Sequence, residues 1–249
     1  MSSTFQTNPK SIGLKEDYLY EVLATTFSIN NNNIIPNTAC MGIRLIDNSS
    51  IKLRPYPNTS TYNNLRSNKL ITLNFVDDIY LYALASLKDL NRSKNIKIFP
   101  EEFHDYYKIK NKEKIKEVFK NHSNSEMVSL PYVKQAWAII ACVAMGEEQI
   151  VKNNDLGESR LVEFTLSIFS CGKFKESYKI FNRAENLALE TIILTTKLKF
   201  AEEKKDKALV QKIEQKIEEY FAEIRRFGLN LSALKVVEHV KGYINNLKT

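Results

Sequence analysis

The chain has 249 residues, of which 43% are hydrophobic, 26% charged and 10% aromatic. This balance is typical of a globular protein and excludes a disordered chain, and the length allows one large domain or two smaller ones. No apolar run reaches the roughly 18–20 residues that a membrane helix needs, and the first ten residues lack the apolar core of a secretory signal. We therefore expect a cytoplasmic protein with no membrane partner, and its three widely spaced cysteines fit free thiols in a reducing compartment.

The charge balance is basic, with 36 Lys and Arg against 29 Asp and Glu and a formal net charge of +7. Such an excess attracts phosphate-bearing ligands and, weakly, nucleic acid. Most lysines stand beside glutamates in residues 108–120 and 202–226, as they do on solvated helix faces. The charge pattern therefore disfavours nucleic acid as the partner.

Short β-like segments make up the first third of the chain. Residues 19–28 run into four consecutive asparagines, which suit a turn because asparagine tolerates left-handed backbone. Residues 38–46 and 51–56 flank an Asp-Asn-Ser-Ser cluster and predict a hairpin. Residues 69–76 predict a further strand, with even-numbered side chains on one face and odd-numbered ones on the other. Together these segments predict a small antiparallel sheet or barrel.

The middle of the chain has a less regular pattern. Residues 78–87 predict a short helix with Asp77 or Asp78 as its N-cap, which explains this acidic pair better than a general acid/base couple does. The charged residues 91–129 indicate an excursion on the surface, and their histidines are expected there too.

Two apolar segments and three helices follow. Residues 136–145 are expected to form a buried strand or a buried helix, and periodicity alone cannot decide between them. In residues 160–171 apolar and polar residues alternate as they do in a strand. From about Phe174 the apolar period is helical. Three helices are predicted, the last capped by Asn230 or Ser232, and the middle one carries a single apolar stripe made of Leu209, Ile213, Ile217, Tyr220, Ile224 and Phe227.

The stretch from Arg54 to Leu65 carries the clearest chemical signal. It places an arginine, several hydroxyls and side-chain amides around the start of a predicted helix. Free backbone N–H groups at a helix start, together with such donors, form an anion site. A capping loop explains the same residues without a ligand, since Asn, Ser and Thr also cap helices for their own sake.

A second stretch, Pro36 to Arg44, places small residues and Gly42 within a strand, where a flat ligand can approach the backbone. In order, the two stretches and the Leu-Asn-Phe-Val-Asp-Asp that follows resemble a largely uncharacterised archaeal family of FMN-binding split-barrel proteins related to flavin reductases. The residues Phe181–Asn186 and Thr195–Leu198 are similar to that family's helical extension, although Lys197 stands where the family usually has arginine.

The resemblance implies an α+β fold, with an antiparallel FMN-binding split β-barrel in residues 15–173 and a three-helix region in residues 174–249. It also implies a homodimer with one FMN per subunit near the interface. The flavin ring would lie against the strand, the phosphate would sit in the loop, and two further residues are open to either a ligand or a structural role. These candidate residues are Thr38, Ala39, Cys40 and Met41 for the ring, Arg54, Asn58, Thr59, Thr61 and Asn64 for the phosphate, Tyr62 for stacking or for the core, and Arg183 for the flavin region or for a helix start.

The function that follows from this resemblance is an FMN-dependent oxidoreductase that uses NADH or NADPH. The alternative is an FMN-binding module without turnover that acts as a carrier, sensor or docking platform. A nucleic-acid-binding barrel is the weakest of the three hypotheses. Cys40 is a half-buried strand residue or a redox-active thiol, and the three histidines have no metal-ligand spacing, so no metal is expected.

Overall fold

The computed structural model describes residues 5–6, 8–31, 33–88, 99–110, 127–154, 157–177, 183–226 and 230–248. The chain divides into two compact units. The barrel unit comprises Met1–Val76 and Pro100–Ser177, and the helical unit comprises Asp77–Phe99 and Tyr178–Thr249. The predicted boundary differs from this division, because residues 77–99 cluster with the C-terminal helices and not with the barrel.

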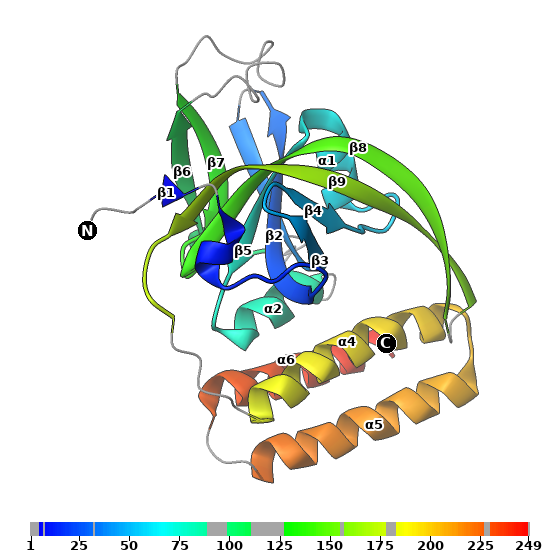
Figure 1. Ribbon diagram of the computed structural model, residues 1–249. Coiled ribbons are helices and arrows are strands. Elements are labelled where there is room, and N and C mark those ends of the chain that lie inside the picture. Colours follow the sequence, from blue (N-terminus) through cyan, green and yellow to red (C-terminus); the bar gives the residue numbers. More distant parts are fainter. Residues whose placement is uncertain are drawn as a thin grey trace. The chain divides into compact units, whose positions relative to one another are not determined.

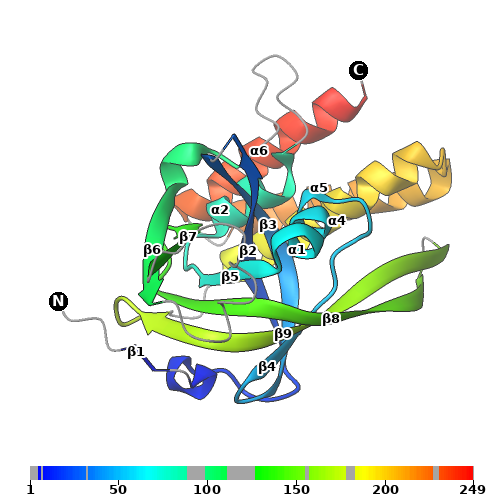
Figure 2. The same cartoon turned by 90° about the horizontal axis from the view of Figure 1, so that it is seen from above.

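Six antiparallel strands close into the barrel (Figures 1 and 2). The ring runs β9-β4-β3-β2-β5-β8, and β8 pairs with β9 to close it, while the short β1 pairs with Cys171 and Gly172 near the C-terminal end of β9. This confirms the predicted antiparallel barrel. The strands are β1 (Phe5–Gln6), β2 (Leu19–Asn30), β3 (Asn33–Asp47), β4 (Ser50–Leu53), β5 (Leu70–Phe75), β8 (Ala138–Asn154) and β9 (Gly157–Lys173).

The barrel interior is filled by alternate side chains of these strands, as a period of two requires. On β5 the odd-numbered residues face this interior and the even-numbered ones face outward. Helix α1 (Ser60–Asn68) contributes Leu65 to the same core, and the 3-10 turn η1 (Pro9–Ile12) contributes Ile12. The helix thereby lies with its buried face on the barrel core and its N-terminal loop near the strands.

A second, two-stranded sheet, made of β6 (His104–Lys110) and β7 (Met127–Val133), covers outward-facing residues of the barrel. It is preceded by the 3-10 turn η3 (Glu101–Phe103). The surface excursion predicted for residues 91–129 is therefore wrong over β6, whose Ile109 packs with Phe27 and Leu130 in a small core of its own. The remaining parts, residues 89–98 and 111–126, lie outside the described residues.

Strands β8 and β9 settle the ambiguity of residues 136–145, which form a strand. Both strands have 17 residues, longer than predicted, and they run side by side past the rest of the barrel in Figures 1 and 2. The pairing with β5 ends at Val143, and the register between β8 and β9 shifts between Ala144 and Gly146. A bulge of this kind bends a strand, so it falls where β8 leaves the closed ring.

The helical unit contains α2 (Ile79–Ser86), α4 (Arg183–Glu203), α5 (Lys207–Arg226) and α6 (Leu231–Leu247). The three predicted C-terminal helices are confirmed, and α2 joins them because most of its side chains are apolar and buried and contact α4 and α6. Asp78 caps α2 and Asn230 caps α6, each through its side-chain oxygen, as predicted. In α5, Phe221 is buried in place of Tyr220, and Phe227 lies outside the described residues. No helix in the described part of the chain has both the length and the apolar character for crossing a bilayer.

Candidate functional site

The loop that enters α1 is a well-defined cap. The Thr59 hydroxyl donates to the Tyr56 carbonyl at 2.8 Å and accepts from the Tyr62 backbone N–H at 3.3 Å. Asn58 has a φ of +66°, a left-handed conformation that asparagine tolerates better than most residues. Asn58, Thr59 and Ser60 are exposed. The sequence therefore predicts this helix start correctly, and its polar side chains remain accessible to a ligand.

Thr61 and Asn64 do not join that exposed group, because both are buried against the strands. The Thr61 hydroxyl accepts from Asn37 Nδ2 at 3.3 Å, and Asn64 Nδ2 donates to the Thr26 hydroxyl at 3.1 Å. These bonds attach α1 to β2 and β3. The five predicted donors therefore do not converge on one exposed point, since Thr61 and Asn64 are buried and bond to the neighbouring strands.

Arg54 precedes the loop and is held by a carboxylate that the sequence analysis missed. Glu163 accepts from Arg54 Nε at 2.5 Å and also pairs with Lys52, and only 5% of the glutamate side chain is exposed, whereas half of the arginine is. Burial raises the pKa of Glu163, but the hydrogen bonds and charges of Lys52 and Arg54 outweigh it and hold the pKa below its ordinary value. We call Lys52, Arg54 and Glu163 the charged triad, and its formal charge is +1.

Thr38 faces the β6–β7 sheet from the outer side of β3. Its hydroxyl lies 2.8 Å from that of Thr25 and 2.8 Å from Nε2 of His104. Asn74 on β5 extends the chain of bonds by donating to the Thr25 hydroxyl at 3.0 Å. The predicted surface position of His104 is wrong, because only 6% of it is exposed. We call Thr25, Thr38, Asn74 and His104 the buried polar network.

The next three residues of β3, Ala39, Cys40 and Met41, are partly exposed. The Cys40 thiol donates to Glu21 Oε2, with 3.6 Å between the sulfur and that oxygen. Beside Gly42 the space is not open, because a Cβ there would meet Leu19 Cδ1 at 3.2 Å. The strand therefore offers backbone and partly exposed side chains at Ala39–Met41, and a side chain at Gly42 would have to displace the end of the exposed Leu19 side chain.

The remaining candidate residues separate into different places. Tyr62 is partly buried and packs edge-on against Phe164 with ring centroids 6.0 Å apart, which favours its role in the core. Arg183 is exposed as the first residue of α4 in the helical unit, so it is not among the residues that the barrel unit brings together. His239 is half-buried on α6 against Tyr80, and His122 lies outside the described residues.

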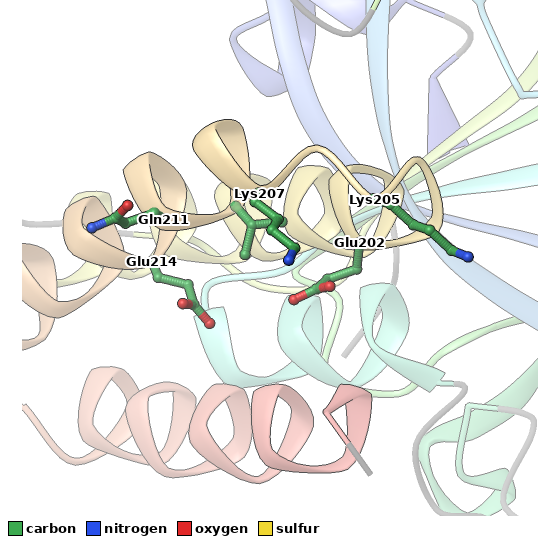
Figure 3. Close-up of a pocket in the computed structure, with 6 residues that line it drawn as sticks. Glu202, Lys205, Lys207, Gln211 and Glu214 are labelled. Carbon is green, nitrogen blue, oxygen red and sulfur yellow. The ribbon is translucent and has the colours of Figure 1, made fainter.

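Each unit has a cavity lined by charged side chains, and the one in the barrel unit borders Tyr62, which Arg66 and Phe164 of its lining contact. The helical unit has one of about 290 Å³ at the turn between α4 and α5, where the charged side chains of Glu202, Lys207 and Glu214 point to the same side (Figure 3). Lys248 pairs with Glu214 at 2.6 Å, so one of the carboxylates that line this cavity is already paired. The barrel unit has one of about 220 Å³ beside the C-terminal end of α1, where Arg66 pairs with Glu147 at 3.5 Å. Among the described residues, no cluster of His, Cys, Asp and Glu could hold a metal ion.

Residues 20–170 match the family described as "Protein of unknown function (DUF447) N-terminal domain", and the chain belongs to this family. A solved structure of an FMN-bound protein of the same family from Methanosarcina mazei is 18% identical, with a TM-score of 0.63 over 95% of this chain and 98% of that one. This likeness shows that the two proteins share a fold, and it confirms the split barrel followed by C-terminal helices.

Two flavin-related structures are more distantly similar. The styrene monooxygenase flavin reductase from Pseudomonas putida S12 is 10% identical, with a TM-score of 0.39 over 63% of this chain and 82% of that one. The flavoredoxin from Methanosarcina acetivorans is 14% identical, with a TM-score of 0.40 over 66% of this chain and 73% of that one. No curated protein matches the sequence.

Proposed function

We propose that this protein binds FMN on the barrel unit, as a homodimer, and serves as an oxidoreductase that takes a hydride from NADH or NADPH. The observation that carries the proposal is the position of Arg54. This arginine is fixed by Glu163 at the start of a loop whose exposed polar residues cap α1, so a cation and a helix N-terminus lie a few residues apart. Both features favour a phosphate group.

The residues present fit this cofactor. Arg54, Asn58 and Thr59 are exposed and would hold the phosphate, and the charged triad carries the net positive charge that a dianion needs. Thr61 and Asn64 would support the loop from below and not touch the ligand. The FMN-bound relative in the same family supports the ligand class.

The partly exposed backbone of Ala39–Met41 would meet the polar edge of the flavin ring. When bound, FMN supplies the capacity to accept a hydride from a nicotinamide and to pass the electrons on. The role of the protein is then to bind and orient the flavin, and the Cys40 thiol, which donates to Glu21, takes no part.

The test is the visible spectrum of the protein purified without added cofactor, followed by anaerobic addition of NADH or NADPH. We expect a flavin spectrum, release of FMN on denaturation, and bleaching by one of the two nicotinamides. Sedimentation at several protein concentrations checks the dimer. A colourless protein that also fails to bind added FMN contradicts the proposal.

A second function, an FMN-binding module without turnover, is favoured by the size of the helical unit. The four helices α2, α4, α5 and α6 form a compact unit of their own, separate from the barrel that carries the candidate residues. Tightly bound FMN that neither nicotinamide reduces would favour this module over the oxidoreductase.

A further inference from the structure

Glu163 is unusual among the charged residues of the barrel unit because it is a carboxylate almost fully removed from water. Its two oxygens are divided between two cations, Oε1 toward Lys52 Nζ and Oε2 toward Arg54 Nε at 2.5 Å. Strand pairing explains the geometry. Leu53 on β4 is opposite Phe164 on β9, so Glu163 lies next to Arg54, and Lys52 projects to the same outer face two residues before it.

The two cations are not buried to the same degree as their partner. Half of the Arg54 side chain and 38% of the Lys52 side chain are exposed, against 5% of Glu163. A buried carboxylate therefore holds the inner edge of the guanidinium, while a large part of the arginine faces solvent. Arginine has five donors in a rigid plane, so fixing it through Nε also fixes the direction of its remaining donors.

We infer that Glu163 is a positioning residue, which holds Arg54 in the orientation that binds the phosphate of the bound flavin nucleotide. The inference rests on the proposed function. A free arginine side chain loses rotamer freedom when it binds a ligand, and Glu163 removes that freedom before the ligand arrives. Glu163 does not touch the ligand itself. Without its effect on Arg54, its negative charge would only repel a phosphate.

The charge of Glu163 and its positioning role predict opposite changes in FMN affinity when this residue is replaced. Replacing Glu163 with glutamine removes a negative charge beside the anion site, and a purely electrostatic effect would strengthen FMN binding. Loss of positioning weakens it instead. Riboflavin has the same ring without the phosphate, so its affinity reports on the ring site and on general damage to the fold.

The experiment measures the dissociation constants of FMN and riboflavin for full-length wild-type protein and Glu163→Gln by quenching of flavin fluorescence. We expect FMN affinity to fall about tenfold and riboflavin affinity to stay within about twofold. Glu147→Gln is the matched control, since it also removes one negative charge from a carboxylate paired with an arginine, Arg66. It should change neither affinity by more than about twofold.

Tighter or unchanged FMN binding by Glu163→Gln, or equal weakening of both flavins, overturns the positioning role. Should Glu163→Gln not fold, Glu163→Asp retains the charge but is too short to reach both cations, and the same selective loss of FMN is expected from it. Wild-type protein that binds neither flavin would refute the proposed function itself, a result distinct from any of these.

Discussion

Asn74 uses both ends of its side-chain amide to join strands of the barrel to the sheet above them. Its Nδ2 group donates to the Leu23 carbonyl at 2.6 Å and to the Thr25 hydroxyl at 3.0 Å, and its Oδ1 accepts from the Val133 backbone N–H at 2.8 Å. All of these groups are buried. A buried polar group without a partner is costly, so this amide stabilises β2, β5 and β7 together.

Asn74→Ala should therefore lower the free energy of unfolding by about 2–4 kcal/mol, because it leaves the Val133 N–H and the Thr25 hydroxyl without this partner. Urea unfolding followed by circular dichroism measures the change. Asn63→Ala, at an exposed position of α1, is the control and should stay within about 0.5 kcal/mol. A loss at Asn74 no larger than that of the control would contradict the role of the network.

Glu163 makes stability depend on pH. Its pKa in the folded protein is below its ordinary value, so its contribution is complete above the unfolded pKa and is lost as the pH falls through the folded pKa. We expect Glu163→Gln to be less stable than wild type by about 1 kcal/mol at pH 7, since both cations are partly exposed. The gap should narrow as the pH falls from about 5 to about 3. Urea midpoints at each pH measure it, and a constant gap would show that charge is not the cause.

Some helix caps and candidate residues can be predicted from the sequence, whereas the surroundings of Glu163 and His104 cannot, and the difference is the distance along the chain to their partners. Thr59 and Asp78 bond to backbone groups two or three residues away, so local sequence is enough to predict them as caps. Glu163 bonds to Arg54, 109 residues away, and His104 bonds to Thr38, 66 residues away. No local signal marks either residue, since its environment exists only after the barrel has closed.

At the scale of elements, the same reasoning explains which strands the sequence predicts. The hairpin of β3 and β4 and the strand β5 have clear alternation and turn residues, and both are found. Strand β6 is missed because it is charged and contains His104, and β7 because Pro131 is atypical within a strand. The outer end of β8, from Gly146, and the first three residues of β9 are missed because their sequences, Gly-Glu-Glu-Gln-Ile-Val-Lys-Asn-Asn and Gly-Glu-Ser, are rich in polar residues.

The helices of the helical unit are held by their apolar stripes. Ile217 lies in the middle of α5 and is fully buried, whereas Leu231 at the start of α6 is 71% exposed. Ile217→Ala should lower the free energy of unfolding by about 2–5 kcal/mol. Leu231→Ala should lower it by less than about 0.5 kcal/mol, although both substitutions remove a comparable aliphatic side chain. Hydrogen exchange of the α4, α5 and α6 amides measures the local stability. Equal effects of the two substitutions would contradict the packing described for α5.

At the scale of the whole molecule, the division into two units follows chain topology that the sequence does not reveal. The predicted boundary at residue 174 comes from a change in periodicity, and the first of the long helices, α4, begins at Arg183. Periodicity does not detect that α2 belongs with them, since the 96 residues between Ser86 and Arg183 include β6 to β9 of the barrel unit. The sequence of α2, an apolar helix of eight residues, does not show which of the two units it packs in.

The proposed placement of FMN on the barrel unit leads to a prediction about where the ligand stabilises the protein. A ligand that binds only the folded state adds about 2.7 kcal/mol at a free concentration of 100 times its dissociation constant. Arg54, Asn58 and Thr59, with the Ala39–Met41 backbone, all lie in the barrel unit. We therefore expect FMN at that concentration to slow hydrogen exchange in β3, β4 and α1, the elements that carry or flank these residues.

Riboflavin at the same concentration is the control, and it should protect β3 but not the start of α1, because it lacks the phosphate. The amides at the start of α4 distinguish the two readings of Arg183, a residue whose own backbone N–H lies at that helix end. Protection confined to β3, β4 and α1 would leave Arg183 as an ordinary helix start, whereas protection that extends to α4 would place this arginine at the ligand. Equal protection of α1 by FMN and riboflavin would contradict a phosphate site in this loop.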